Sequence, residues 1–263
     1  MPKFESYANS YKNIALTRRD GILEVRVHSN GGPLKWGALD TSAHAQLGEA
    51  FYNIGRDADN RVVILTGTGD NFLTEFAMDE LGTGSGPTPA YWDRIFIEGK
   101  DLLMNLLDIP VPVIGAVNGP AFIHAELVTM SDIVVAADNA SFADLAHFPG
   151  GTVPGDGVHV WWEMLLGVNR ARYFLLTGQQ IPAQDALTLG IVSEVVPQDK
   201  LLARAWELAQ QLAKQPTLTL RYSRAAMTQN IKRRMQADLG YGLMLEGMAV
   251  MGSFWPGGSG GAK

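Results

Sequence analysis

Hydrophobic and polar positions alternate along residues 14–27, on either side of an Arg-Asp-Gly tripeptide at 19–21. This period of two predicts a pair of strands, and the aspartate and glycine suit the tight turn of a hairpin. Residues 41–54 instead carry apolar side chains at helical spacing behind a polar cap at Asp40 and Thr41. The same patterns predict strands at 62–65, 111–117 and 133–137 and helices at 91–107 and 126–130.

Beyond Pro154 the pattern becomes mostly helical. Helices are predicted at 158–166, 170–177, 183–189, 201–214 and 218–248, with one strand at 191–196. Because strands alternate with helices in the first half, the chain is expected to form a layered α/β architecture.

The composition, with 46% hydrophobic and 18% charged residues, is typical of a globular protein. The absence of cysteine excludes disulfides, thiolate metal sites and a cysteine nucleophile. A net charge of −6 and scattered basic residues argue against nucleic-acid binding. Since the sequence contains neither a signal segment nor a long apolar run, we expect a cytoplasmic protein without membrane association.

The predicted strand at 111–117 leads into Asn-Gly-Pro at 118–120, and helical spacing starts at Ala121. A turn between a strand and a helix presents free backbone N–H groups, which suit a carbonyl oxygen that gains negative charge. The run Asn-Gly-Pro-Ala-Phe-Ile-His-Ala-Glu at 118–126, followed by Ser-Asp-Ile at 131–133, resembles the enoyl-CoA hydratase/isomerase (crotonase) superfamily. Further anchors of this resemblance are Val-Ile-Leu-Thr-Gly at 63–67, Phe142, Thr-Val-Pro-Gly at 152–155 and Leu-Thr-Gly at 176–178.

The resemblance implies an α/β fold with a crotonase-like spiral of ββα turns. It implies a catalytic core over residues 1–200, a C-terminal helical trimerisation region over 201–250 within the same fold unit, and assembly into homotrimers or dimers of trimers. The glycine-rich segment 256–263 is expected to be a flexible tail.

Several motifs depart from the acyl-CoA members of this superfamily. Where those members have a glycine-containing oxyanion loop, this chain has Glu75, and Ile-His-Ala at 123–125 replaces the glycines of the second oxyanion element. The basic C-terminal segment of CoA-binding relatives is missing, and the position of the second hydratase carboxylate falls on His147. These departures disfavour CoA as a ligand.

The departures resemble the branch that contains 6-oxocamphor hydrolase and related β-diketone hydrolases. The matching residues are Trp36, His124, Glu126, His147, Asp156 and Glu246. The resemblance implies hydrolysis of the carbon–carbon bond between two carbonyls (a retro-Claisen reaction) without a cofactor, on a small-molecule diketone, to give a keto acid or a ketone plus an acid.

Each of these residues has a predicted role. His147 is expected to be the base that activates water, since imidazole titrates near neutrality, with Asp156 as its partner. Asp156 could instead cap the helix at 158. His124, at a helix start, is expected to stay neutral and to donate to a carbonyl or enolate oxygen.

The remaining predictions concern Trp36, Glu126, Glu246 and the other histidines. Trp36 offers an indole N–H to a substrate oxygen, and Glu246 is placed near the His147/Asp156 pair as a catalytic group. Glu126 either binds substrate or has a structural role. Since the five histidines show no close pairing in the sequence, no metal site is expected, and His44 shows no partner pattern.

Two rival functions remain open at the level of the sequence. The first is an enoyl-CoA hydratase or isomerase that uses Glu126 as its carboxylate. The second is a catalytically silent, oligomeric binding protein of the same fold.

Overall fold

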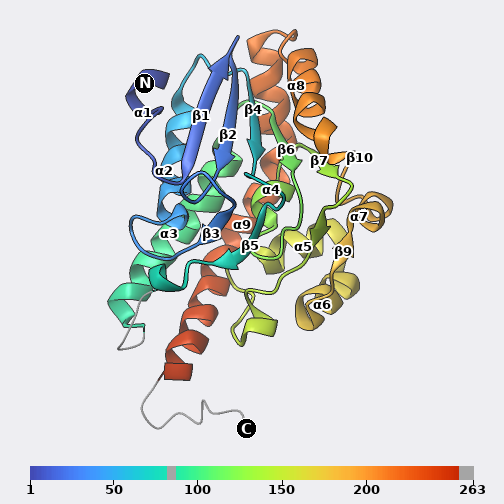
Figure 1. The fold of residues 1–263 in the computed structure, drawn as a ribbon. Coiled ribbons are helices and arrows are strands. Elements are labelled where there is room, and N and C mark those ends of the chain that lie inside the picture. Colours follow the sequence, from blue (N-terminus) through green and yellow to red (C-terminus); the bar gives the residue numbers. More distant parts are fainter. Residues whose placement is uncertain (82–86, 255–263) are drawn as a thin grey trace.

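A six-stranded sheet forms the centre of the computed structural model, which describes residues 1–81 and 87–254 (Figure 1). Its strand order is β1-β2-β4-β6-β7-β10, and only the β1/β2 pair is antiparallel. The strands are β1 (Ile14–Arg19), β2 (Ile22–Val27), β4 (Val62–Thr66), β6 (Val113–Val117), β7 (Ile133–Ala137) and β10 (Glu194–Val196). Asp20 and Gly21 both have positive φ (52° and 77°), as the predicted tight hairpin turn requires.

A second, smaller layer of short strands lies beside this sheet. β3 (Leu34–Trp36) pairs in parallel with β5 (Leu73–Phe76), and β8 (Ser141–Phe142) pairs with β9 (Ile181–Pro182). Ala121 connects the two pairs, because it forms one parallel β-bridge with Leu73 and another with Phe142. Successive segments therefore add one strand to each layer before a helix, which is the predicted ββα spiral.

Helices cover both faces of the main sheet. α8 (Leu201–Leu212) packs on one face, whereas α2 (Ala43–Arg56) and α3 (Pro89–Asp108) lie on the side of the larger core. α9 (Thr217–Phe254) runs down the length of the molecule and contacts α3 (Figure 1). The shorter helices are α1 (Phe4–Tyr7), α4 (Glu126–Thr129), α5 (Val158–Leu166), α6 (Val168–Thr177) and α7 (Ala183–Leu189).

Arg224 fixes α9 to the end of α3. Its guanidinium is buried, lies 2.7 Å from Asp132 Oδ2, and donates to the carbonyl oxygens of Leu106, Leu107 and Ile109. These carbonyls belong to the last turn of α3 and its C-cap, where intrahelical partners are lacking. A single side chain thus satisfies the helix end and holds the final helix in place.

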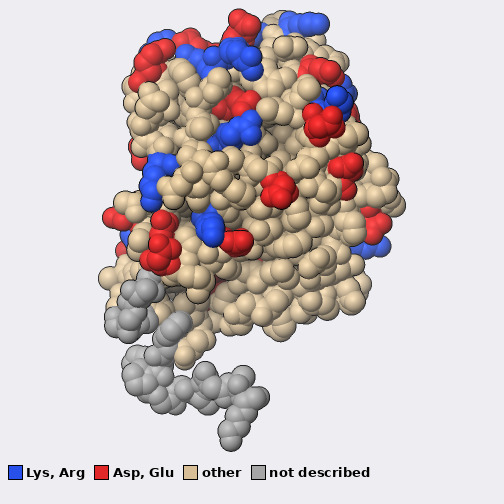
Figure 2. Space-filling model, in the orientation of Figure 1, with Lys and Arg blue, Asp and Glu red and all other residues tan. Residues whose placement is uncertain are grey.

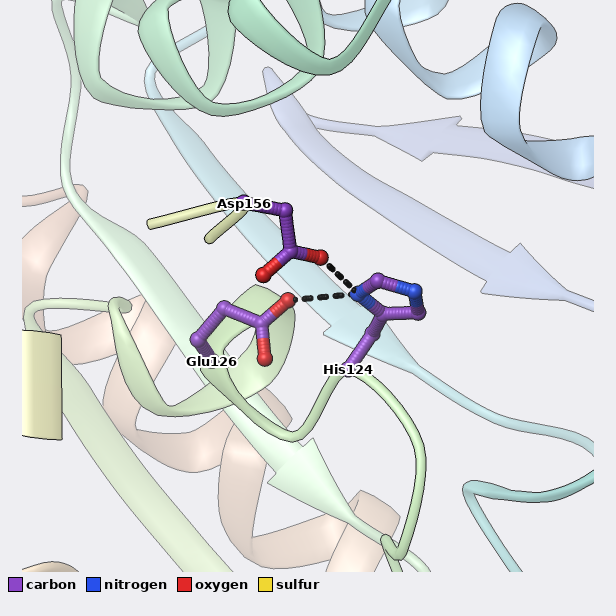
Figure 3. A group of neighbouring side chains, drawn as sticks. All are labelled: His124, Glu126 and Asp156. Atoms are coloured by element: carbon purple, nitrogen blue, oxygen red, sulfur yellow. Dashed lines mark hydrogen bonds and ion pairs between the residues drawn. The ribbon is translucent and has the colours of Figure 1, made fainter. Parts of the chain in front are cut away.

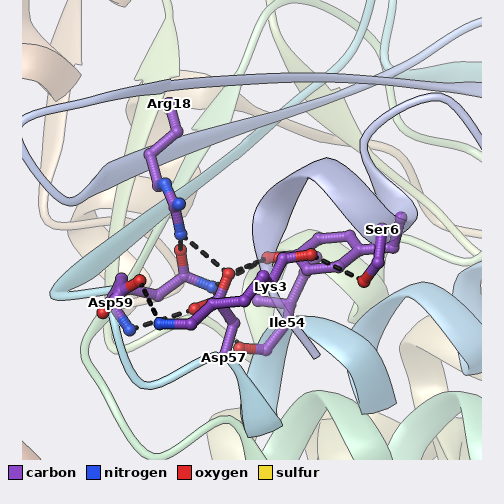
Figure 4. Close-up of polar contacts among 8 residues, drawn as sticks. Lys3, Ser6, Arg18, Ile54, Asp57 and Asp59 are labelled. Carbon is purple, nitrogen blue, oxygen red and sulfur yellow. Dashed lines mark hydrogen bonds and ion pairs between the residues drawn. The ribbon is translucent and has the colours of Figure 1, made fainter. Parts of the chain in front are cut away.

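The N-terminal helix is held by a second polar cluster (Figure 4). The carboxylate of Asp57, which follows α2, accepts hydrogen bonds from the Tyr7 hydroxyl at 2.9 Å and from Arg18 at 2.7 Å. Asp57 is buried, and Lys3 pairs with Asp59 at the surface. This cluster joins α1, β1 and the end of α2.

Most predicted elements are confirmed, with shifted ends. α2 begins at Ala43 behind Ser42 rather than at Thr41, α8 ends at Leu212, and α9 extends beyond both ends of the predicted 218–248. The prediction of helix from Ala121 is wrong, since the chain stays non-helical until Glu126. The predicted tail at 256–263 lies outside the described residues.

The surface carries mixed charges. On the face shown in Figure 2, acidic and basic side chains are interspersed and gather mainly over its upper half. Within residues 1–81 and 87–254, no helix combines the length and apolar character needed to cross a membrane.

Candidate active site

The turn after β6 places His124 in an unusual backbone conformation. Its φ is 49°, in the left-handed region that favours glycine and costs other residues about 1–2 kcal/mol. The N–H groups of Phe122 and Ile123 both donate to the carbonyl oxygen of Leu73, at 2.9 and 3.2 Å. The prediction that this turn offers free N–H groups is therefore wrong for these two amides, whereas the side chain of His124 lines the cavity described below.

Two carboxylates hold one nitrogen of His124 (Figure 3). Nδ1 lies 2.9 Å from Glu126 Oε1 and 3.0 Å from Asp156 Oδ2. Burial opposes a charge on His124, but these two carboxylates outweigh it and raise its pKa to about 10. The predicted neutral imidazole is thus corrected to an imidazolium, because α4 is only one turn long while both carboxylates are in direct contact.

His147 lies between two aspartates. Its Nδ1 is 2.7 Å from Asp144 Oδ1, and its Nε2 is 3.2 Å from Asp156 Oδ2. Burial alone would lower the pKa of His147, but Asp156 and Asp144 together hold it well above its ordinary value. The sequence interpretation missed Asp144, although its position three residues before His147 was a usable signal.

Asp156 connects the two histidines and does not cap α5. Gly157 is the N-cap residue, and no side-chain hydrogen bond caps this helix. Burial would raise the pKa of Asp156, but His147 and His124 hold it well below its ordinary value. The predicted contact between Asp156 and His147 is present, and the helix-cap alternative is wrong. The catalytic role of this pair stays a prediction.

Glu246 reaches the same cluster from α9. A carboxylate oxygen of Glu246, a ring nitrogen of His147 and a carboxylate oxygen of Asp156 all lie within 4.8 Å of one another. The approach depends on Gly155, since a Cβ there would lie 2.2 Å from the carbonyl oxygen of Gly242. Burial and the nearby Asp156 raise the pKa of Glu246 to about 8, so this carboxyl is protonated at neutral pH.

Trp36 at the end of β3 packs against His124, with ring centroids 4.3 Å apart and the ring planes tilted by 39°. Trp36 also contacts His44 edge-on, with ring centroids 5.6 Å apart, and Nδ1 of His44 is 3.0 Å from Glu98 Oε2. The His44/Glu98 contact could not be predicted from sequence spacing, because the two residues belong to different helices, α2 and α3.

The cluster opens into a cavity of about 480 Å³. The polar part of this cavity is lined by Trp36, His44, His124, His147, Asp156 and Glu246. Aromatic and aliphatic side chains form the rest of the wall, among them Phe76, Leu81, Tyr91, Trp92, Ile95, Leu243 and Val250. Glu126 is buried, does not line this cavity and contacts His124, which favours the structural alternative.

The histidines are closely paired after all. The rings of His124 and His147 are 5.6 Å apart, and His124/Glu126/Asp156 and His147/Asp156/Glu246 each form a potential ligand set for a cation. The spacing argument against a metal was therefore mistaken. Because both imidazoles have raised pKa values, a metal ion would have to displace protons from them.

The spiral fold and this cavity define a crotonase-type enzyme. Residues 18–247 match the enoyl-CoA hydratase/isomerase family, and the chain belongs to that family. Carnitinyl-CoA dehydratase of Salmonella typhi is 36% identical over 211 residues, which cover 80% of this chain and 77% of that protein. An enoyl-CoA hydratase/isomerase from Mycobacterium paratuberculosis, 24% identical over 91% of this chain and 94% of its own, shares the fold with a TM-score of 0.83.

A more similar structure is a β-diketone hydrolase from the cyanobacterium Anabaena, bound to (S)-3-oxocyclohexyl acetic acid. It is 49% identical and superposes with a TM-score of 0.88 over 93% of this chain and 96% of its own. This similarity in sequence and fold confirms the resemblance to the β-diketone hydrolase branch.

Proposed function

We propose that this protein hydrolyses the carbon–carbon bond between the carbonyls of a β-diketone. The observation that carries the proposal is the cluster of His124, His147, Asp156 and Glu246 at the polar end of a largely apolar cavity. Such a cleavage needs a base for water, a donor for the oxyanion and a proton for the departing carbon. The cluster contains a candidate for each.

His124 is the proposed oxyanion donor. Its Nδ1 is occupied by Glu126 and Asp156, while its Nε2 has no hydrogen-bond partner among the described residues and His124 lines the cavity. A charged imidazolium donor is stronger than a neutral one. The indole N–H of Trp36, packed beside it, is the proposed donor to the second carbonyl, which becomes the enolate.

The His147/Asp156 pair is the proposed base. Asp144 fixes the Nδ1 side of His147, so the proton that must leave is the one shared between Nε2 and Asp156. The pair holds its protons tightly, so it can accept a proton from water only after it has lost one. The pKa for this loss describes the two residues together and not either one alone. The activated water adds to the carbonyl, and collapse of the oxyanion breaks the bond to the carbon between the carbonyls.

Glu246 is the proposed source of the final proton. With a pKa of about 8 it carries a proton at neutral pH, and its Oε2 is buried without a hydrogen-bond partner among the described residues. Transfer of this proton to the carbon of the enolate completes the addition of one water molecule. The products are one carboxylic acid and one ketone, joined in a keto acid when the substrate is cyclic.

The keto acid named with the Anabaena enzyme suggests a first substrate to test. Hydrolysis of a bridged bicyclic 1,3-diketone with three two-carbon bridges opens one ring. It leaves a cyclohexanone that carries an acetic acid arm at position 3, which is the skeleton of that ligand. We propose cyclic β-diketones of this size as substrates.

The similarity to carnitinyl-CoA dehydratase favours an acyl-CoA reaction as a second candidate. Against it, the Glu126 carboxylate faces His124 instead of the cavity, and the amides of Phe122 and Ile123 are occupied. Crotonyl-CoA hydration by the purified protein distinguishes this candidate.

The test mixes purified protein with cyclic and linear 1,3-diketones and follows loss of the diketone and appearance of acid. Turnover of at least one diketone, strongly reduced in Asp156→Asn, is the expected result. No turnover on any diketone contradicts the proposal. Thermal stabilisation by diketones without turnover would instead favour a silent binding protein.

A further inference from the structure

We propose that Trp92 sets the upper size limit for the substituent on the carbon between the two carbonyls of the substrate. The inference rests on the proposed function and adds a specificity-determining residue to it. Trp92 lies in the first turns of α3, outside the cluster of titratable side chains, and its indole forms part of the cavity wall.

The indole is held in one orientation. Its Nε1 donates to the carbonyl oxygen of Leu243 at 3.0 Å, although that carbonyl lies inside α9. Leu243 also lines the cavity. A rotation of the ring would leave the indole N–H without this partner, so the hydrogen bond resists it.

The ring also lies directly on the backbone of α9. A Cβ at Gly247 would stand 2.1 Å from Nε1 of Trp92 and 2.3 Å from its Cδ1, so only glycine permits this contact. The ring therefore has no room to withdraw toward α9. It forms a fixed wall, unlike a flexible side chain that a larger ligand could push aside.

The position of this wall relative to Glu246 identifies the part of the substrate that meets it. Glu246 precedes Gly247 in α9, and both Glu246 and Trp92 line the cavity. The proposed proton transfer brings the carbon between the carbonyls to Glu246. Leu243, which holds the Trp92 indole, is three residues before Glu246 on the same helix, so we expect a substituent on that carbon to face the Trp92 ring.

The chemistry of the wall selects an uncharged hydrocarbon group. Tyr91, Ile95, Leu243 and Val250 lie around the same cavity, and its lining contains no lysine or arginine among the described residues. Arg94, on the same helix, is paired with Glu98 at 2.8 Å. Carboxylates of the polar cluster disfavour an anionic substituent, so the limit set by Trp92 applies to alkyl groups.

The experiment measures kcat/KM for 1,3-diketones that carry hydrogen, methyl, ethyl, propyl or butyl on the carbon between the carbonyls. One methylene in a hydrophobic pocket is worth roughly 10- to 200-fold in discrimination. For Trp92→Ala we expect the ratio of kcat/KM for butyl over methyl to rise at least about 10-fold above the wild-type ratio. Trp92→Phe, which shortens the ring, should give an intermediate ratio.

Ile97→Ala is the matched control, since Ile97 is on the same helix, 53% exposed and outside the cavity lining. It should keep the wild-type ratio. An unchanged ratio in a folded, active Trp92→Ala protein overturns the inference. If Trp92→Ala does not fold, an unchanged ratio in Trp92→Phe overturns it equally.

A binding measurement separates this inference from the proposed function. Calorimetry with the matching monoketones, which lack the second carbonyl and are not cleaved, reports the size limit without catalysis. If the wild-type protein hydrolyses no diketone but Trp92→Ala shifts binding toward the longer chains, the proposed function fails and the role of Trp92 stands. If diketones are hydrolysed but the ratio of kcat/KM for butyl over methyl is unchanged in both Trp92→Ala and Trp92→Phe, only the inference fails.

Discussion

The Oδ2 atom of Asp156 lies 3.2 Å from Nε2 of His147. The same oxygen is 3.0 Å from Nδ1 of His124, so one carboxylate couples the proposed base to the proposed oxyanion donor. A change in the charge of any one of the three groups alters the proton affinity of the other two.

Asp156→Asn tests this coupling. The amide keeps the size of the side chain but removes the charge, and we expect kcat/KM to fall by roughly 10²- to 10⁴-fold, as for loss of a positioned base. Steady-state hydrolysis of the best diketone is the measurement. Asp199→Asn, at an exposed site, should leave the rate unchanged. Full activity in Asp156→Asn would falsify the role of this carboxylate.

The pH dependence of kcat/KM should be bell-shaped with an alkaline optimum. The active form needs a His147/Asp156 pair that has lost a proton, and the pKa of His147 lies well above 6.5. It also needs protonated Glu246, whose pKa is about 8. The rate should therefore rise from pH 6 toward pH 8 and fall beyond it. A maximum at pH 5–6 would contradict this assignment of protons.

The stability of the fold should decrease as pH rises above about 4.5. The pKa of Glu246 is about 8 in the folded protein, against the ordinary value of 4.5 for a glutamate. The unfolded chain therefore loses this proton first, and the stabilising effect of the proton is lost as pH rises between these two values. Glu246→Gln, which cannot ionise, should remove on the order of 2–4 kcal/mol of this dependence. Urea unfolding at pH 5 and pH 8.5 gives the change in the free energy of unfolding between the two pH values. An equal change in the wild type and in Glu246→Gln would contradict the buried, protonated state.

Arg224→Ala should destabilise the protein by about 3–5 kcal/mol, because it leaves Asp132 and three carbonyl groups without their buried partner. The free energy of unfolding in urea measures the loss. Arg233→Ala, at an exposed position of α9, is the control and should change stability by less than about 0.5 kcal/mol. Similar values for the two variants would show that the contact does not hold α9.

The predicted trimer also remains to be tested. α9 exposes several large apolar side chains, Tyr222, Met227, Tyr241, Met244 and Met248, which are costly to leave in water. Light scattering coupled to gel filtration should give a mass of three or six chains. A monomer mass at micromolar concentration would contradict the prediction.

The sequence predicted much of the fold because its strands and long helices have clear periodicity, and the motif at 118–126 identified the spiral. It also identified Trp36, His124, His147, Asp156 and Glu246, all of which line one cavity. The non-helical stretch before Glu126 was missed, because apolar spacing does not reveal that Ala121 bridges two short strands.

Protonation states could not be predicted from the sequence. The position of His124 after a turn suggested a neutral ring, but its pKa depends on the distances to Glu126 and Asp156, which lie on different segments. Glu98 was missed because its partner His44 lies on another helix. Asp144 was missed although it stands only three residues before His147, since spacing alone does not show that the two side chains are in contact.

The delivery of Glu246 by the last helix has a consequence for how activity arises. The chain up to α5 already contains both histidines and Asp156, but the carboxyl that completes the cluster arrives only when α9 docks against Gly155 and Trp92. Under the roles proposed above, a chain without that docking contains the base and the oxyanion donor but lacks the proton donor. We therefore expect turnover to begin only when α9 has docked.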